Sequence, residues 1–375
     1  MIRLTVPSID EADYEAIRQV LETGFLVQGQ HVATFEQSIA DYIGVDHAVA
    51  VSNCTAALHM ALLALDVRPN DLVIVTAYSW LSTANVIELC GAQPIFVDIN
   101  AGTFNMDVDH LRATLTRLMA TTDTARRVKA IIPVHTFGQV ADMPAITAIA
   151  EHYDLPVIED AACALGASLH GQQAGTWGVG CFSFHPRKAI TTGEGGIITT
   201  HDEELANRLR ALRNHGIDPV AGKIDFIMPG FNYRLTEFQA AMGVTQMVKL
   251  DRIITARRER ARIYDDLLAN TPYEAPYTSE GGEPVYQSYV ALIPEDADRQ
   301  AIIDFLLKND IQSTIGTYHM PMTTYFRTRY GYQAGDFPVA DNVFARSLTL
   351  PLHEFLTEDE QQQVVEHLCH ALGNM

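Results

Sequence analysis

Lys188 is the residue of this sequence best placed for covalent chemistry, because it ends an aromatic, strand-like run and precedes a glycine-rich turn. The run FSFHPRK occupies residues 182–188, and ITTGEGG at 190–196 leads into the next apolar segment. A lysine in a partly desolvated loop has a lowered pKa and becomes a usable amine nucleophile. Most loop lysines are simply solvated, so this segment by itself supports both interpretations.

Two acids, Glu159 and Asp160, end an apolar run just before Ala161. An unpaired buried carboxylate is costly, so an acid at the edge of a buried site needs a cationic or hydrogen-bonding partner. A protonated pyridine nitrogen would be such a partner. On local grounds, a helix N-cap by Asp160 fits the pattern equally well.

Two weaker features precede these acids in the chain. The turn SNCTAAL at 52–58 is small and polar, and the backbone N–H groups near Thr55 and Ala56 could hold a phosphate against a helix dipole. Trp80 follows an apolar run and could stack on a planar heterocycle. The plain alternatives are an N-cap by Asn53 or Thr55, and core packing by Trp80.

A phosphate turn, an aromatic ring, an acid and a lysine thus occur in this chain order. Pyridoxal phosphate requires all four: a phosphate anchor, a surface for its ring, a carboxylate on its ring nitrogen and a lysine that binds it as a Schiff base. The combination predicts a pyridoxal-phosphate site that uses Lys188 and one of the two acids, Glu159 or Asp160. No strand is followed by GxGxxG and no metal-ligand constellation stands out, so a nicotinamide enzyme and a metalloenzyme are poorly supported.

Short apolar runs that alternate with helical patterns must position these residues. Runs without polar alternation are typical of strands covered on both faces, and the order predicts an α/β domain on a mainly parallel sheet. Ligands of such sheets bind beyond the carboxyl ends of the strands. The predicted strands span 47–52, 72–76, 94–98, 129–134, 156–159, 180–184 and 196–199, and predicted helices span 55–65, 82–90, 143–153 and 202–214.

A second α+β segment follows a long helical pattern at 234–268 and a Pro/Gly/Glu stretch at 271–284. We predict a large cofactor-binding domain at residues 1–245 and a smaller C-terminal domain at 246–375. The second segment has a predicted strand at 287–293 and predicted helices at 298–309 and 357–372.

Composition limits the class of protein. The chain has 375 residues, 47% of them hydrophobic, and a net charge of −20, which argues against nucleic acid or an acidic membrane as partner. No segment is apolar over the length of a membrane span, and the first residues have no signal-peptide core. The five cysteines have no CxxC spacing, so free thiols in a reducing compartment are expected. These features predict a cytoplasmic protein.

The sequence resembles the DegT/StrS-type sugar aminotransferases from about residue 7 to residue 367. The resemblance implies the fold-type-I pyridoxal-phosphate architecture: a three-layer large domain with a mainly parallel seven-stranded sheet, and a smaller α+β domain. The matching motifs are IEDAA at 158–162, FSFHPRK and ITTGEGG within 182–196, NYRLTEFQAA at 232–241, PVHTFGQVADM at 133–143 and GDFPVADN at 335–342.

The resemblance also implies roles for individual residues. Lys188 matches the Schiff-base lysine that acts as general acid and base, Asp160 matches the partner of the pyridine nitrogen, and Trp80 matches the stacking position. Asn232 matches a residue that the neighbouring subunit delivers to the phosphate, which implies a homodimer. The phosphate cradle is matched by Thr55, Ala56 and the hydroxyl of Ser183.

The chain departs from the family pattern at three positions. Cys54 stands where glycine is usual in the phosphate turn, which then lacks the conformational freedom of glycine. Cys163 stands where glutamine or histidine is usual beside the ring hydroxyl of the cofactor. Pro321 stands where related sequences often carry a substrate-side histidine; either His319, two positions away, compensates for it, or the substrate differs.

The activity implied is transfer of an amino group from glutamate or glutamine to a keto sugar, with the cofactor passing through its pyridoxamine phosphate form. The ITTGEGG loop resembles that of 4-aminating members such as perosamine synthases, which implies a nucleotide-linked 4-keto-6-deoxy acceptor for amino-sugar, polysaccharide or O-antigen biosynthesis. A 3-keto sugar, a cyclitol, or a sugar dehydratase are alternatives, although the dehydratases carry histidine at the lysine position. A non-catalytic member would lack the lysine or the acid. Weak candidates for binding a diphosphate are Arg187, His215 and Lys223.

Overall fold

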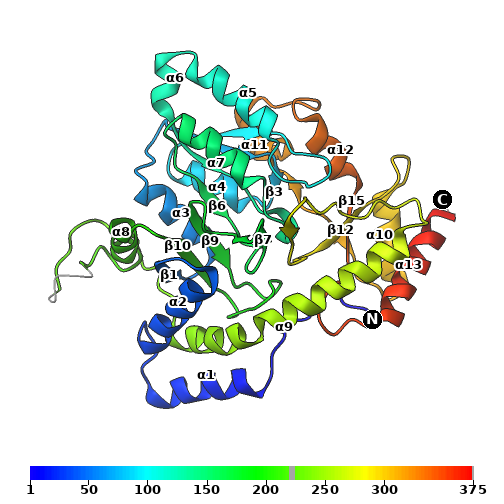
Figure 1. The fold of residues 1–375 in the computed structure, drawn as a ribbon, viewed down its shortest axis with the longest axis horizontal. Coiled ribbons are helices and arrows are strands. Elements are labelled where there is room, and N and C mark those ends of the chain that lie inside the picture. Colours follow the sequence, from blue (N-terminus) through cyan, green and yellow to red (C-terminus); the bar gives the residue numbers. More distant parts are fainter. Residues whose placement is uncertain (219–223, 374–375) are drawn as a thin grey trace.

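A seven-stranded sheet lies at the centre of the computed structural model, which describes residues 1–218 and 224–373 (Figure 1). Its strands, in spatial order, are β4 (Gln93–Val97), β2 (Leu72–Thr76), β5 (Val128–Ile132), β6 (Ile158–Asp160), β9 (Val179–Ser183), β10 (Gly196–Thr200) and β1 (His47–Val51). The first three strands and the last four form two ladders, which parallel bridges between β5 and the β6 segment join into one sheet. Only β10 among these strands runs antiparallel to its neighbours. The predicted mainly parallel sheet is therefore confirmed.

Helices cover both faces of this sheet. On β2, Leu72 and Ile74 belong to one hydrophobic cluster and Val73 and Val75 to the other, because successive side chains of a strand point to opposite faces. The predicted three-layer α/β arrangement follows from these two cores. The first cluster includes side chains of α2 (Gln30–Ile43), α5 (Val108–Met119), α7 (Met143–His152) and α9 (Glu237–Leu268), and the second those of α3 (Cys54–Ala64), α4 (Ser82–Leu89) and α8 (Glu203–Arg213).

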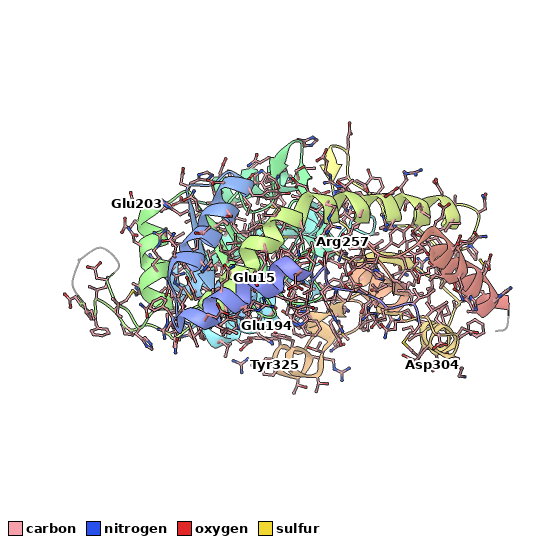
Figure 2. All side chains as sticks on the ribbon, turned by 90° about the horizontal axis from the view of Figure 1, so that it is seen from below. Glu15, Glu194, Glu203, Arg257, Asp304 and Tyr325 are labelled. Carbon is pink, nitrogen blue, oxygen red and sulfur yellow. The ribbon has the colours of Figure 1, made fainter. Side chains whose placement is uncertain are left out.

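The N-terminal helix α1 (Glu11–Thr23) was not predicted, because a single apolar side chain, Val20, is buried on it. A capping box at Asp10 begins the helix. Polar contacts attach it to α9: the Lys249 amine lies 2.6 Å from an Asp13 oxygen and 2.8 Å from an Asp10 oxygen. Figure 2 shows α1 lying across α9 in this region. An apolar-period search misses a helix that is held in this way.

A second antiparallel sheet, β12 (Tyr289–Leu292), β15 (Ser347–Leu350) and β13 (Thr314–Ile315), lies at the C-terminal end of α9. Together with α10 (Arg299–Lys308) and α13 (Glu358–Gly373) it encloses a third hydrophobic core. The predicted domain boundary at residue 245 falls within α9, which continues unbroken from one unit to the other (Figure 1). The division into two domains stays a prediction. No helix in the described ranges is long and apolar enough to cross a membrane.

Candidate active site

The predicted chemical residues gather at the carboxyl ends of neighbouring strands. Asp160 is the last residue of β6, which pairs in parallel with β9, and Lys188 follows β9 by a short loop. The Lys188 amine donates a hydrogen bond to Cys163 Sγ at 3.1 Å. Charge interactions connect Cys54, at the start of α3, with both Asp160 and Lys188. Three segments that are far apart in the sequence therefore meet at one place.

The loop that carries Lys188 is fixed by its own backbone. The Lys188 N–H donates to the His185 carbonyl at 2.8 Å, and the Thr192 N–H donates to the Phe184 carbonyl at 3.1 Å. At the end of the ITTGEGG segment, a Cβ on Gly196 would lie 2.4 Å from the backbone of Asn53. Glycine at 196 thus lets the start of β10 pack closely on the turn before α3. This packing brings the lysine loop and that turn together.

The amine of Lys188 differs from the sequence prediction in its protonation. Burial lowers its pKa, but the charge and hydrogen bond of Cys163 outweigh burial, with further contributions from Cys54 and Asp160, so the pKa is raised. The predicted lowering of the Lys188 pKa is wrong because the prediction considered burial alone. The Cys163 sulfur contacts the amine and favours its charged form. The amine is thus held as an ammonium in the absence of another partner.

Of the two acids on β6, Glu159 is fully occupied. It is completely buried and accepts hydrogen bonds from the N–H groups of Gly175, Trp177 and Gly178 at 2.8 to 2.9 Å, and it pairs with His135 Nε2 at 2.9 Å. The Ala141 N–H donates to Nδ1 of His135. Nε2 therefore carries the ring proton and donates to Glu159. This carboxylate ties β6 to the segment before β9 and has no acceptor capacity left for a ligand.

Asp160 retains acceptor capacity. Its Oδ2 accepts from the Thr83 hydroxyl at 2.6 Å, and its Oδ1 accepts from the Ala162 N–H at 3.2 Å. Burial raises the pKa of this carboxyl group, and the two hydrogen bonds together with the charge of Lys188 oppose that rise. No helix begins after Asp160, so it is not a helix N-cap. A buried carboxylate with free lone pairs is what a protonated ring nitrogen requires.

Thr83, on α4, is a residue that sequence reasoning missed. We expect Thr83→Val to lower kcat roughly tenfold to a hundredfold, since a hydrogen bond to a charged group contributes about 1.5–3 kcal/mol. Loss of the hydroxyl also raises the pKa of Asp160, so the acid limb of the pH–rate profile moves to higher pH. Steady-state kinetics across pH measure both effects. Thr83→Ser keeps the donor and serves as the control; a valine variant with an unchanged profile would contradict this role.

The predicted phosphate turn is a capped helix N-terminus. Asn53 is the N-cap of α3, and its side chain accepts from the Ala56 N–H at 2.8 Å. The Ala56 N–H is therefore already engaged, whereas Thr55 is exposed in the first turn. The Ser183 hydroxyl accepts weakly from the His185 N–H at 3.4 Å, which leaves its own proton to donate. The N-terminus and these hydroxyls together suit an anion.

Trp80 is 61% exposed, so the alternative that it fills the core is wrong. It follows β3 (Tyr78–Ser79), which pairs with β14 (Tyr318–His319), and its ring meets that of Tyr318 edge to face at 5.5 Å. His319 points the other way: it is 3% exposed and pairs with Asp341 at 3.2 Å. His319 therefore does not replace the substrate-side histidine, and Tyr318, which alternates with it, is the side chain beside Trp80.

Asn232 lies in an extended segment and is exposed. Its neighbours Phe231 and Tyr233 stack on each other at 4.7 Å and contact His59 of the same chain, so the Asn232 side chain points away from them. Within the described part of the chain, the side-chain amide of Asn232 forms no hydrogen bond. Of the weak diphosphate candidates, the Arg187 and His215 positions are described, and Lys223 lies outside the described residues.

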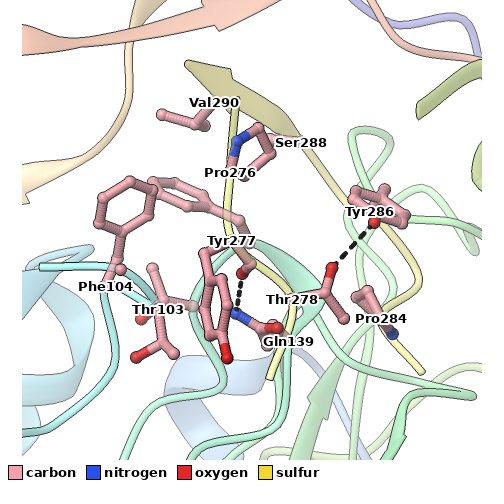
Figure 3. A pocket seen from close by; sticks show the side chains of 13 residues that line it. Thr103, Phe104, Gln139, Pro276, Tyr277, Thr278, Pro284, Tyr286, Ser288 and Val290 are labelled. Carbon is pink, nitrogen blue, oxygen red and sulfur yellow. Dashed lines mark hydrogen bonds between the residues drawn. The ribbon is translucent and has the colours of Figure 1, made fainter. Parts of the chain in front are cut away.

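Figure 3 shows a small pocket whose lining includes none of these residues. It lies between the turns after β4 and β5 and the segment before β12, where Gln139 donates to the Tyr277 carbonyl at 3.0 Å. Phe104, Phe137 and Tyr286 line it in left-handed backbone conformations. Its lining contains no lysine, histidine, cysteine or carboxylate, so the reactive groups are those around Lys188.

The donor set around Lys188 fits pyridoxal phosphate. An amine, a buried carboxylate with free lone pairs, an exposed aromatic face and a helix N-terminus supply the four requirements of that cofactor. Among the described residues no group of three His, Cys, Asp or Glu side chains is arranged to hold a metal ion.

Known proteins share both sequence and fold with this chain. The model of the DegT/DnrJ/EryC1/StrS aminotransferase family matches residues 7–369. GDP-perosamine synthase from Caulobacter vibrioides is 36% identical and covers 99% of this chain and 98% of its own length; spore coat polysaccharide biosynthesis protein SpsC from Bacillus subtilis is 34% identical over 96% and 95%. The structure of Spr1654 from Streptococcus pneumoniae in its PMP-form superposes with a TM-score of 0.92 at 28% identity, covering 100% of this chain and 98% of that one, and its PLP-form gives 0.91.

Proposed function

The chain belongs to the DegT/DnrJ/EryC1/StrS aminotransferase family, and on that premise we propose that it transfers an amino group from glutamate or glutamine to carbon 4 of a nucleotide-linked 4-keto-6-deoxy sugar. It is a pyridoxal-phosphate-dependent sugar aminotransferase with the α/β fold of its neighbours. The observation that carries the proposal is the shared site of the Lys188 amine and the buried Asp160 carboxylate, with the ITTGEGG loop directly beside it.

Pyridoxal phosphate, when bound, would supply the electron sink that holds the electron pair left when a proton is removed, until that pair takes up a proton again. The residues of this chain bind the cofactor and move the proton. Lys188 Nζ moves the proton, and Cys163 Sγ accepts a hydrogen bond from it. Asp160, held by Thr83, keeps a proton on the ring nitrogen. Trp80 presents a ring face beside Tyr318, and the start of α3 with Ser183 binds the phosphate.

Two observations support carbon 4 over the neighbouring carbon. The segment 190–196 follows the lysine by two residues, so its shape helps to determine how the sugar lies over the cofactor. The relative GDP-perosamine synthase is similar over nearly the whole chain. We expect NMR of the product, formed from a 4-keto-6-deoxy nucleotide sugar and glutamate, to show nitrogen on carbon 4. Nitrogen on carbon 3, or amination of a cyclitol ketone alone, would overturn the regiochemistry and leave the cofactor assignment standing.

We also propose a homodimer in which Asn232 reaches the phosphate site of the partner subunit. Ile224, Phe226 and Ile227, in the same segment, are 56% to 76% exposed, a concentration of apolar surface that is usual at interfaces. Asn232→Ala is expected to weaken cofactor binding about tenfold or more, because a phosphate loses a charge-assisted donor. Cofactor titration measures the effect, and Asn270→Ala, at another exposed asparagine, is the control.

Mixing subunits tests whether Asn232 acts across the interface. A dimer with Lys188→Ala in one subunit and Asn232→Ala in the other keeps one site with both residues intact only if the asparagine comes from the partner. Mixed dimers should therefore regain about half the activity of the wild type per hybrid. An active monomer, or no gain on mixing, would contradict the arrangement. A cytoplasmic location stays a prediction.

A further inference from the structure

Cys163 and Lys188 form a close contact that the proposed amino transfer does not by itself require. The distance from Lys188 Nζ to Cys163 Sγ is 3.1 Å. The two residues come from different segments, the turn after β6 and the loop after β9, and both backbones are fixed. The Cys163 carbonyl packs against Gly138, where a Cβ would approach it to 2.9 Å, and the Lys188 N–H donates to the His185 carbonyl. The contact is therefore part of the fold.

The thiol is the acidic group to which the amine donates its hydrogen bond. Asp160 acts on the amine through its charge and not through a hydrogen bond. Cys54, the other thiol near the amine, is buried. An ammonium next to a thiol stabilises the thiolate, and a thiolate stabilises the ammonium, so each compensates for the burial of the other. The contact therefore places the thiol proton within direct reach of the Lys188 nitrogen.

Within residues 1–218 and 224–373, no other cysteine forms a hydrogen bond with a lysine amine. Burial raises the pKa of the Cys54 and Cys181 thiols well above the ordinary value, and raises that of Cys90 to about 11. Cys369 is exposed on α13, and Cys163 is half-buried, so reagents in solution can reach both. Among the described cysteines, Cys163 combines access with a lysine amine in direct contact, which singles it out as a candidate for reaction with electrophiles.

We propose that Cys163 is an activated thiol and a modification site for soft electrophiles, nucleophilic while the Lys188 amine is free and quenched while Lys188 is bonded to the cofactor. The proton passes from Sγ to Nζ and gives the thiolate and the ammonium. With an alkyl halide such as iodoacetamide, the sulfur electron pair forms the S–C bond, the C–I bond breaks, and iodide leaves with its electron pair. A lysine nitrogen that is bonded to the cofactor no longer accepts the thiol proton as a free amine does. The pyridoxamine phosphate form of the enzyme, in which the Lys188 amine is free, is therefore the form in which Cys163 reacts with electrophiles.

The test compares alkylation of one protein in two forms, prepared with pyridoxal phosphate and with pyridoxamine phosphate. Each is pulsed with iodoacetamide, and peptide mass spectrometry gives the rate at each cysteine. We expect Cys163 to react at least tenfold faster in the pyridoxamine phosphate form, while Cys369 reacts equally in both and serves as the internal standard. Cys54 and Cys181 should stay unlabelled. Equal or slower labelling of Cys163 in the pyridoxamine phosphate form would overturn the proposal.

A variant of Lys188 distinguishes activation of Cys163 by the amine from shielding of Cys163 by the cofactor. Lys188→Met keeps the length of the side chain and removes the proton acceptor, so labelling of Cys163 in the pyridoxamine phosphate form should fall at least tenfold; an unchanged rate would also overturn the proposal. Thermal melting confirms that this variant is folded. The inference rests on a cofactor bonded to Lys188 but not on the sugar. Because labelling is read by mass, a wrong acceptor or wrong carbon leaves this result unaffected.

Discussion

Lys188→Ala is expected to abolish the visible absorbance of the purified enzyme and to lower kcat by at least about a thousandfold. The amine is the group that bonds to the cofactor and moves the proton, and no other lysine amine among the described residues interacts with Asp160 and Cys163. Absorbance spectra of protein reconstituted with excess cofactor, together with single-turnover kinetics, measure the two effects.

A matched control for this variant is Lys308→Ala, at an exposed lysine on α10, which should change neither absorbance nor turnover. The Lys188→Ala protein should keep its melting temperature within a few degrees, because the amine is paired with a thiol and not with a structural network. A coloured, active Lys188→Ala protein would show that another amine carries the cofactor.

Asp160→Ala should bind the cofactor yet lose roughly a hundredfold or more in turnover, since preorganised electrostatic stabilisation of this kind is typically worth about 3–4 kcal/mol. Without the carboxylate the ring nitrogen loses its proton, and the charge formed on proton removal is delocalised less well. Steady-state kinetics and the absorbance of the bound cofactor measure the effect, and the absorbance should persist because Lys188 is intact.

Glu159→Gln provides the contrast that identifies the correct acid. Glu159 accepts four hydrogen bonds inside the protein, so the amide would turn an N–H group toward buried donors and lower the melting temperature. We expect Glu159→Gln mainly to lower the melting temperature, and Asp160→Ala mainly to lower turnover. Near-normal turnover in Asp160→Ala, with a catalytic defect in a stable Glu159→Gln, would mean that the two roles are reversed.

The sheet and its helices were largely predictable because burial on both faces leaves a strong signal. β2 reads LVIVT and is buried throughout, and the strands of the central sheet lie within two residues of their predicted ends. α1 was missed because polar contacts to Lys249, and not an apolar stripe, hold it. Short elements such as β14 are fixed by pairing with β3 across more than 200 residues of sequence, which no local pattern encodes.

The site was predictable in its residue types but not in its contacts. Lys188 and Asp160 stand in specific motifs, and the family resemblance assigned the ring nitrogen to Asp160. The physical reason, that hydrogen bonds inside the protein occupy Glu159, is visible only in the structure. In the sequence, Thr83 is an ordinary hydroxyl residue near the start of a helix. Only the fold places its hydroxyl beside Asp160. The pKa of Lys188 was predicted with the wrong sign because Cys163 is adjacent in space and 25 residues away in sequence.

Borohydride reduction followed by peptide mass spectrometry tests the central claim most directly. Reduction makes the bond between a lysine nitrogen and pyridoxal phosphate permanent, so the labelled lysine can be read from the peptide mass. The account predicts the cofactor mass on Lys188 and on no other lysine of the chain. A label on a different lysine, or a fully reconstituted protein that carries no label, would contradict it.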